Sequence, residues 1–234
     1  TKISQKELIG TLNTVIFCPE DLQLIKGTPS GRRRFLDMEI SQTSATYYHQ
    51  LMQYNRLLQQ RNAILKEYRG KQNIPLEEWD LQLADMASFI VKKRLESLKK
   101  INLLIDLMNR KLTGGLENLT IGYEQPYIDN GSLEYTKEGF YERIKAALPQ
   151  DRHRMTTSVG PHRDDLRFFS DAMDLKKFGS QGQQRTAVLS LKLSELEFIK
   201  SEVGEYPVLL LDDVLSELDE SRRANLLQFI HKRI

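Results

Sequence analysis

The second quarter of the chain carries apolar residues at helical spacing. From Tyr47 to Tyr68 they recur at steps of three and four, with Arg61 as the one polar break. A second run of this kind extends from Trp79 to Leu112, after a polar stretch at 70–75, and stops at Gly114 and Gly115. Such spacing is typical of long helices with one apolar face. Two of them joined by a short loop predict an antiparallel helical hairpin.

Shorter patterns on both sides of the hairpin predict strands and further helices. Runs of β-branched, aromatic or alternating residues predict strands at 12–18, 116–123, 155–159, 165–169 and 208–211, the last of them buried. A short helix is expected after Pro19 and should end at Gly27, and longer helices are expected at 132–148, 186–203 and 220–232. We expect Ser132 to begin the first of these three and Pro149 to stop it. Strands and helices mixed around an inserted hairpin indicate the α/β class, with α+β as the alternative.

Charge and composition exclude several classes. The 234 residues carry 34 basic and 32 acidic side chains, so the net charge of +2 does not by itself indicate a nucleic-acid binder. Basic residues are concentrated locally at 32–34, 92–94 and 152–154, where they either face solvent or lie against phosphates. For Arg32, Arg33 and Arg34 three interpretations stay open: contact with DNA, contact with a second copy, or pairing with nearby acids.

The single cysteine, Cys18, excludes a disulfide framework and a Cys-rich metal site, as in a reducing cytosol. No apolar run approaches the roughly 20 residues of a membrane span, and no secretory signal opens the chain. We therefore expect a cytoplasmic protein without a membrane partner. Because the sequence begins at Thr1 without a methionine, we also expect it to be a fragment.

Two segments carry the candidate chemistry. Phe178 to Thr186 places glycines and Ser180 at the mouth of a helix, where unpaired N–H groups and the positive end of the helix dipole attract an anion such as phosphate. About twenty residues later, the run 207–211 ends in Asp212 and Asp213. Carboxylates at a strand end suit Mg²⁺, which takes one or two of them and completes its shell with water and phosphate oxygens. Together the segments indicate half of a nucleotide-hydrolysing site.

These segments resemble the signature motifs of ABC-type ATPases. Ser180-Gln181-Gly182-Gln183 stands in the place of the Ser-Gly-Gly-Gln signature, and 209–213 with 216–219 is similar to the Walker B strand and the D-loop. In more detail, the sequence resembles the RecF family of bacterial recombination-repair proteins in four segments: Phe17–Leu22, Gly31–Asp37, Gly160–Asp165 and Gly179–Thr186. Several segments in the right order make the likeness specific, because a Gly-rich helix start alone is common.

The resemblance implies an SMC-like P-loop ATPase head made of residues 1–28 and 113–234, with residues 29–112 as an inserted helical arm. In such heads ATP and Mg²⁺ lie between two copies. The residues that the resemblance assigns to the ATP held by the other copy are Ser180, Gln181, Gly182, Gln183 and Arg185. It assigns Asp212 to Mg²⁺ and Asp213 to the attacking water, and it places Ser216 and Asp219 at the dimer interface.

The chain departs from the general pattern in three ways. Gly179 and Gln181 replace the Leu and the first Gly of the ABC signature, as is usual in RecF proteins. Asp213 is one methylene shorter than the Glu that usually polarises the water, so slow turnover is expected. No Gly-x4-Gly-Lys-Ser/Thr loop occurs, since Gly70-Lys71 is followed by Gln. That loop supplies most triphosphate contacts, so this chain alone is expected to bind ATP poorly or not at all and not to be ATPase-competent.

For the full-length protein, the resemblance implies ATP-dependent dimerisation on gapped duplex DNA, supporting RecA loading together with RecO and RecR. Alternatives are a transporter's nucleotide-binding subunit and an SMC-like chromosome-organising protein. The helical arm and the Gln-Gly-Gln-Gln sequence at 181–184 argue against the transporter. The second alternative needs much longer arms, whereas residues 29–112 allow helices on the order of 50 Å. The resemblance assigns no ligand to His162 or Arg163.

Overall fold

The structure, a computed structural model, describes residues 11–69, 75–128, 135–213 and 220–233. The chain forms two compact units. Unit 1 comprises Thr1–Ala45, Ser97–Tyr123 and Leu166–Ile234, and unit 2 comprises Thr46–Glu96 and Glu124–Asp165. The described residues are mixed α/β and mostly helical, with small sheets. Residues 29–45 and 97–112 of the expected arm belong to unit 1.

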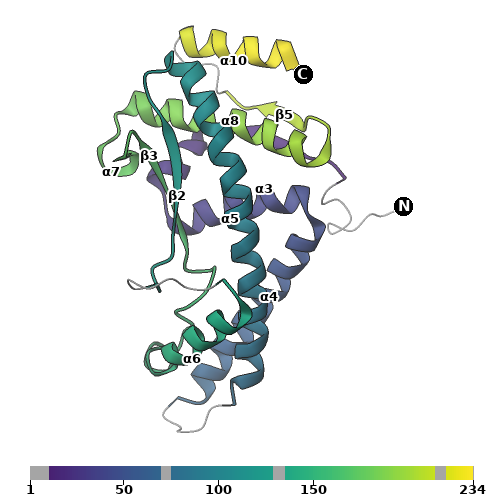
Figure 1. Cartoon of the computed structure of the whole chain (residues 1–234), viewed down its shortest axis with the longest axis vertical. Helices are drawn as coiled ribbons and strands as arrows, with labels where there is room; N and C mark the ends of the chain where they lie inside the picture. The colour runs from purple at the N-terminus through teal and green to yellow at the C-terminus, as the bar shows by residue number, and fades with distance from the viewer. Residues whose placement is uncertain (1–10, 70–74, 129–134, 214–219, 234) are drawn as a thin grey trace. The chain divides into compact units, whose positions relative to one another are not determined.

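Unit 2 is built from helices, and it confirms the predicted pair. Helix α4 spans Ala45–Glu67, α5 spans Glu77–Thr113, and α6 spans Lys137–Arg154. In unit 2, α4, the first half of α5 and α6 lie together, as Figure 1 shows. The apolar spacing was sufficient to predict both hairpin helices because the residues at those steps face the interior, with Tyr47, Tyr54 and Leu65 buried on α4.

The break in the apolar spacing, Arg61, is also buried. Its Nε donates to Asp80 Oδ1 at 2.6 Å, and its Nη1 donates to Asp151 Oδ2 at 2.7 Å and to Thr157 Oγ1 at 2.9 Å. A buried charge needs partners of this kind because its desolvation is costly. Burial also raises the pKa of Asp80, and the neighbouring Arg61 only partly offsets that effect. One polar cluster therefore joins three segments of unit 2.

Both predicted ends of the helix at 132–148 were wrong. Helix α6 begins after Thr136, whose side chain accepts from Gly139 N at 3.1 Å, and it continues through Pro149 to Arg154. Ser132 lies outside the described residues. A proline inside a helix costs about 3 kcal/mol or more, but the turn that follows it places Asp151 against Arg61 in the interior.

The expected strand at 155–159 is absent. Met155 adopts the left-handed conformation, with φ 51°, and ends α6. The next backbone groups bond to side chains: Thr157 N donates to Asn62 Oδ1 at 2.8 Å, and Ser158 N donates to Asp151 Oδ1 at 2.9 Å. Because side chains already pair these N–H groups, the segment does not need a neighbouring strand.

Unit 1 contains both small sheets and α8, a long helix with a buried middle. Strands β1 (Thr14–Phe17) and β5 (Val208–Leu211) pair in parallel, with Thr14 opposite Val208 and Phe17 opposite Leu211. The other sheet has the order β2 (Leu119–Glu124), β3 (Asp165–Ser170) and β4 (Met173–Asp174). Its β3 and β4 are antiparallel. The predicted strands near 12, 116, 165 and 208 are therefore confirmed.

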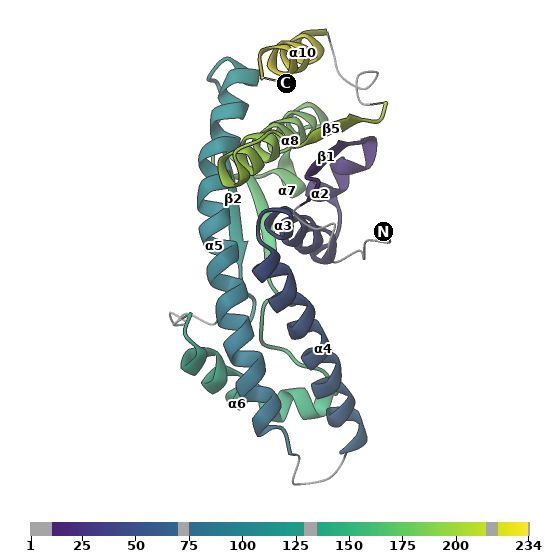
Figure 2. The ribbon, with the colours of Figure 1, turned by 90° about the vertical axis from the view of Figure 1, so that its right-hand side faces the viewer.

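Helix α8 (Gln181–Val203) is the centre of unit 1. Its residues Thr186–Leu196 are all buried, because β1, α3 (Pro29–Thr43) and neighbouring elements pack around it, as Figure 2 shows. Unit 1 also contains the second half of α5, the 3-10 turn η1 (Pro19–Leu22), α2 (Gln23–Lys26), α7 (Leu175–Phe178) and α10 (Glu220–Arg233). Gly27 ends α2 as predicted.

Candidate functional site

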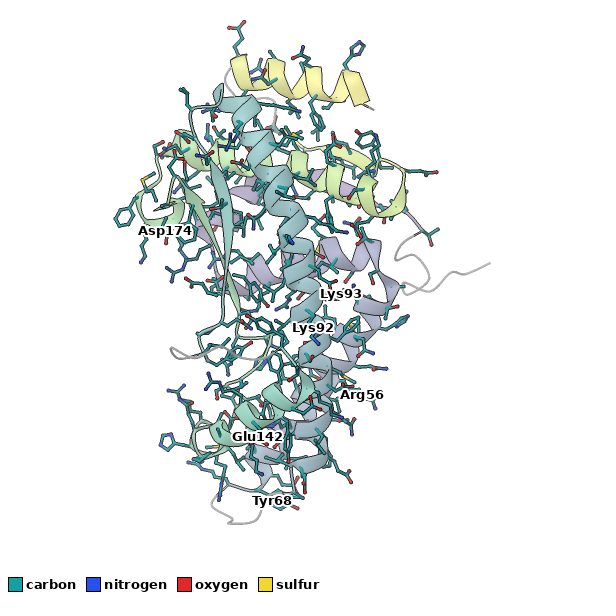
Figure 3. All side chains as sticks on the ribbon, viewed as in Figure 1. Arg56, Tyr68, Lys92, Lys93, Glu142 and Asp174 are labelled. Carbon is teal, nitrogen blue, oxygen red and sulfur yellow. The ribbon has the colours of Figure 1, made fainter. Side chains whose placement is uncertain are left out.

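The turn that carries the predicted signature is held from both ends. Before it, Asp174 caps α7 by accepting from Lys176 N at 2.9 Å, and Figure 3 labels this residue. A Cβ on Gly179 would lie 2.7 Å from Leu175 O and 2.9 Å from Leu175 Cδ2. Only glycine therefore fits at this point, where the chain leaves α7 and enters α8.

Helix α8 begins with a capping box. Gln183 N donates to Ser180 Oγ at 3.2 Å, and Ser180 N donates to Gln183 Oε1 at 3.0 Å. Each side chain thereby satisfies a backbone donor of the other. The N–H groups of Gln181 and Gly182, as the first two of the helix, have no partner within it. The first turn contains no acidic residue.

A further hydrogen bond holds this turn from the side of β2. Gln183 Nε2 donates to Glu117 Oε1 at 3.1 Å. The other oxygen of that carboxylate accepts from Ser170 Oγ at 3.1 Å. The turn is therefore fixed relative to the three-stranded sheet of unit 1. Sequence reasoning did not single out Glu117, and no motif marks it.

The predicted ATP-contacting residues differ in exposure. Ser180, Gln181 and Arg185 are exposed, while Gly182 and Gln183 are partly buried. The residues between and after them, Gln184 and Thr186, are buried. The turn thus exposes Ser180, Gln181 and Arg185 at the positive end of a long helix.

The two candidate carboxylates follow the parallel pair of strands. Asp212 N donates to Phe17 O at 2.9 Å and so continues the ladder beyond β5. Asp213 has φ 49°, a left-handed conformation that aspartate tolerates better than most residues. Both side chains are exposed. Ser216 and Asp219 lie outside the described residues.

The prediction of a buried strand before these acids was wrong. Val208, Leu210 and Leu211 are exposed by 47%, 47% and 38%. In the part of the chain that the structure describes, β5 pairs only with β1, so its apolar side chains are not covered on both faces. Apolar composition indicates that a strand can be buried, but a covering layer is also needed.

The acids fit one part of a magnesium site. Among the described residues, no group of three or more His, Cys, Asp or Glu side chains is arranged to hold a metal ion. Mg²⁺ does not need such a group, because one or two carboxylates suffice when water and phosphate oxygens complete the shell. An exposed carboxylate at a strand end, such as Asp212, is a donor of this type.

The predicted basic clusters differ in placement. Arg32 is buried, and its Nη1 donates to Gly27 O at 2.9 Å, at the end of α2. Arg33 is partly buried and Arg34 is exposed. In the second cluster Arg94 is buried and its Nη1 donates to Pro161 O at 2.7 Å. The expectation that these residues face solvent or lie against phosphates was therefore wrong for Arg94. Figure 3 shows its neighbours Lys92 and Lys93 on α5.

The segment at 160–163 has a structural role in unit 2. His162 Nδ1 lies 2.6 Å from Tyr54 Oη, and His162 Nε2 lies 3.0 Å from Thr157 O. A carbonyl oxygen only accepts, so Nε2 carries the proton and Tyr54 donates to Nδ1 in the neutral ring. Arg163 Nη2 donates to the same carbonyl at 2.6 Å.

Comparison with known proteins finds RecF proteins among the relatives of this chain. No family model matches the chain. The chain is 50% identical over 228 residues to the DNA replication and repair protein RecF of Alkaliphilus oremlandii, covering 96% of this chain and 62% of the relative. It is 47% identical over 234 residues to RecF of Halothermothrix orenii, with 97% and 62% covered. The chain is RecF-like over nearly its whole length. It spans about 62% of the length of these curated relatives.

Solved RecF structures agree with this assignment. The recombination mediator protein RecF-ATPrS of the RecFOR pathway matches with a TM-score of 0.88 and 38% identity, over 97% of this chain and 62% of that one. RecF-ATP of the same pathway matches with the same TM-score and identity. The RecF resemblance and the mixed α/β fold are thereby confirmed. Among the described residues, no helix has both the length and the apolar character of a membrane span.

Proposed function

We propose that this RecF-like chain is part of an SMC-like, ABC-type ATPase head that closes on ATP as a dimer and acts in DNA recombination and repair. Residues 1–28 and 113–234 belong to the head, and residues 29–112 form an arm that offers a partner surface. The observation that carries the proposal is the capped turn at Ser180–Gln183, in which Ser180 and Gln181 are exposed at the start of α8.

In this proposal the turn serves a nucleotide held by the other copy. Ser180 Oγ, the N–H groups of Gln181 and Gly182, and the side chains of Gln183 and Arg185 face its terminal phosphate. Bound Mg²⁺ would neutralise phosphate charge during the transfer. Asp212 would hold that ion in its own copy, and Asp213 would orient the attacking water, slowly because its side chain is short. Ser216 and Asp219 belong to the same dimer interface.

Partners follow from the same proposal. The dimer binds gapped duplex DNA in the cytoplasm and works with RecR, RecO and RecA. In the closed dimer, the basic residues of both copies can contact the same DNA. Because these contacts are made to phosphates, DNA binding should become weaker as the salt concentration rises. Arg34 is the exposed member of the candidate DNA-binding group, with Arg33 partly accessible, whereas Arg32 supports the local fold.

The test measures dimerisation of a full-length protein that carries this chain together with a phosphate-binding loop. Ser180→Arg places a bulky cation at the N-terminus of α8. We expect it to abolish ATP-dependent dimerisation, measured by size-exclusion chromatography. Ser201→Arg, an exposed serine near the other end of α8, is the matched control and should leave dimerisation unchanged. ATP-dependent dimers of the Ser180→Arg variant would rule out the proposal. The 234-residue chain alone is expected to show no ATP hydrolysis.

A further inference from the structure

We infer that Arg222, on α10, is a positioning residue for the turn at 180–183, an inference that rests on the proposed function of that turn. Arg222 Nε donates to Thr186 Oγ1 at 2.9 Å, and its Nη2 lies 3.5 Å from Gly182 O. The Thr186 hydroxyl in turn donates to Gly182 O at 2.9 Å. The guanidinium, the hydroxyl and the carbonyl therefore form one connected group at the first turn of α8.

This group reaches the part of the turn that is proposed to face phosphate. A Cβ on Gly182 would lie 3.6 Å from Arg222 Nη2 and 3.9 Å from Ser180 Oγ. The arginine and the capping serine thus approach the same point on Gly182 from two sides. Thr186 is 4% exposed, so the donor–acceptor geometry around its hydroxyl is fixed by packing.

The position of Arg222 along the chain links the two parts of the proposed site. Helix α10 begins at Glu220, shortly after Asp212 and Asp213. Arg222 therefore connects two parts of the proposed site. Its helix, α10, follows the proposed magnesium-binding acids, and its guanidinium contacts the turn that is proposed to face the other copy. A shift of α10 would break the bonds of the Arg222 guanidinium to Thr186 and Gly182 at the start of α8.

The experiment uses the same full-length protein. Arg222→Ala should raise the dimer dissociation constant at saturating ATP at least tenfold, measured by analytical ultracentrifugation. Affinity of the monomer for ATP, measured below the dimerisation concentration, should change less than twofold. Arg222→Lys keeps the charge and one donor and should recover part of the loss. Arg223→Ala, at an exposed neighbour on α10, removes the same charge and should behave like wild type.

Each outcome separates this inference from the proposed function. If Ser180→Arg abolishes dimerisation while Arg222→Ala does not weaken it, the inference on Arg222 fails and the proposed function stands. If Ser180→Arg still dimerises with ATP, both fail. Equal losses in the Arg222→Ala and Arg223→Ala variants, or a parallel loss of ATP affinity in the monomer, also overturn the inference. Should Arg222→Ala not fold, Arg222→Gln, which keeps an amide donor for Thr186, replaces it in the same comparison.

Discussion

Arg61 and Asp151 form an ion pair of 2.7 Å in which both side chains are fully buried. Asp80 completes the group, with its Oδ1 2.6 Å from Arg61 Nε. Truncating the arginine would leave two acids in the interior of unit 2 without their countercharge. Breaking a buried pair in this way is far more costly than breaking an exposed one.

We therefore expect Arg61→Met to lower the free energy of unfolding by about 3–5 kcal/mol, measured by chemical denaturation. Lys93→Met is the control, because Lys93 pairs with Glu96 at 2.8 Å on an exposed part of α5. That change should cost less than about 1 kcal/mol. Equal effects of the two substitutions would contradict a stabilising role for the buried cluster.

This cluster also shows a limit of sequence analysis. Apolar spacing predicted α4 and α5 because helix periodicity is a local property. It could not assign Arg61, since the partners Asp80 and Asp151 are 19 and 90 residues away along the chain. A polar break in an apolar run has the same sequence pattern whether it faces water or a buried acid.

In the candidate site, too, local features could be predicted from the sequence and contacts between distant residues could not. Local rules were sufficient to place Ser180 near the start of a helix and two acids after β5, because a serine before a helix and carboxylates after a strand are sequence patterns. The helix was expected from residue 186, however, and α8 begins at Gln181. Arg222 and Glu117 could not be found in this way. They reach the turn from α10 and from the residues before β2, and only the tertiary fold brings them there.

Gly160 is expected to be intolerant of any side chain. Its φ is 129°, and a Cβ would lie 2.4 Å from Tyr54 Oη and 3.2 Å from His162 Nδ1. Gly160→Ala combines backbone strain with this clash, so we expect a loss of about 2–4 kcal/mol in the free energy of unfolding. Gly114→Ala is the matched control, because Gly114 has φ 68° and nothing within 4 Å of its Cβ position.

A double-mutant cycle tests whether the clash is responsible. Tyr54→Phe removes the hydroxyl that the new Cβ would meet, so the loss caused by Gly160→Ala should be smaller in that background. If the two substitutions are additive in denaturant titrations, the hydroxyl contact does not account for the effect, and backbone strain alone remains.

The stability of unit 1 should depend on pH through Glu39. Burial raises the pKa of Glu39 to about 7, and Lys192 opposes this shift while Asp21 adds to it. Glu195, also buried, has its pKa raised mainly by burial and then by the Glu39 charge. One oxygen of each carboxyl, Glu39 Oε2 and Glu195 Oε1, has no hydrogen-bond partner among the described residues, which favours the neutral acid.

The direction in which stability changes with pH follows from proton binding by Glu39. Between the ordinary pKa of 4.5 and about 7, folded Glu39 keeps a proton that the unfolded chain has lost. Stability is therefore fully present at low pH and falls as the pH rises through this window. The change for Glu39 is on the order of 3 kcal/mol, at about 1.4 kcal/mol for each pKa unit.

Glu39→Gln keeps the shape of the side chain and removes its titration. We expect the variant to lose less stability than wild type between pH 4.5 and 7, measured by urea denaturation followed by circular dichroism. Glu142→Gln changes an exposed glutamate on α6, labelled in Figure 3, and should keep the wild-type pH profile. A Glu39→Gln profile as steep as that of wild type would show that Glu39 is ionised throughout the window.

The two acids after β5 should have separable effects in the full-length protein. Asp213→Asn removes the base that is proposed to orient water while preserving side-chain size, so kcat for ATP hydrolysis should fall by about 10²-fold or more, in the range typical of general-base loss. ATP-dependent dimerisation should persist.

Asp212→Asn removes the proposed magnesium ligand, so the Mg²⁺ concentration required for half-maximal ATP binding should rise at least tenfold. Glu205→Gln, an exposed acid before β5, is the control for both. If Asp213→Asn raised the Mg²⁺ requirement and Asp212→Asn did not, the proposed roles of the two carboxylates would be reversed.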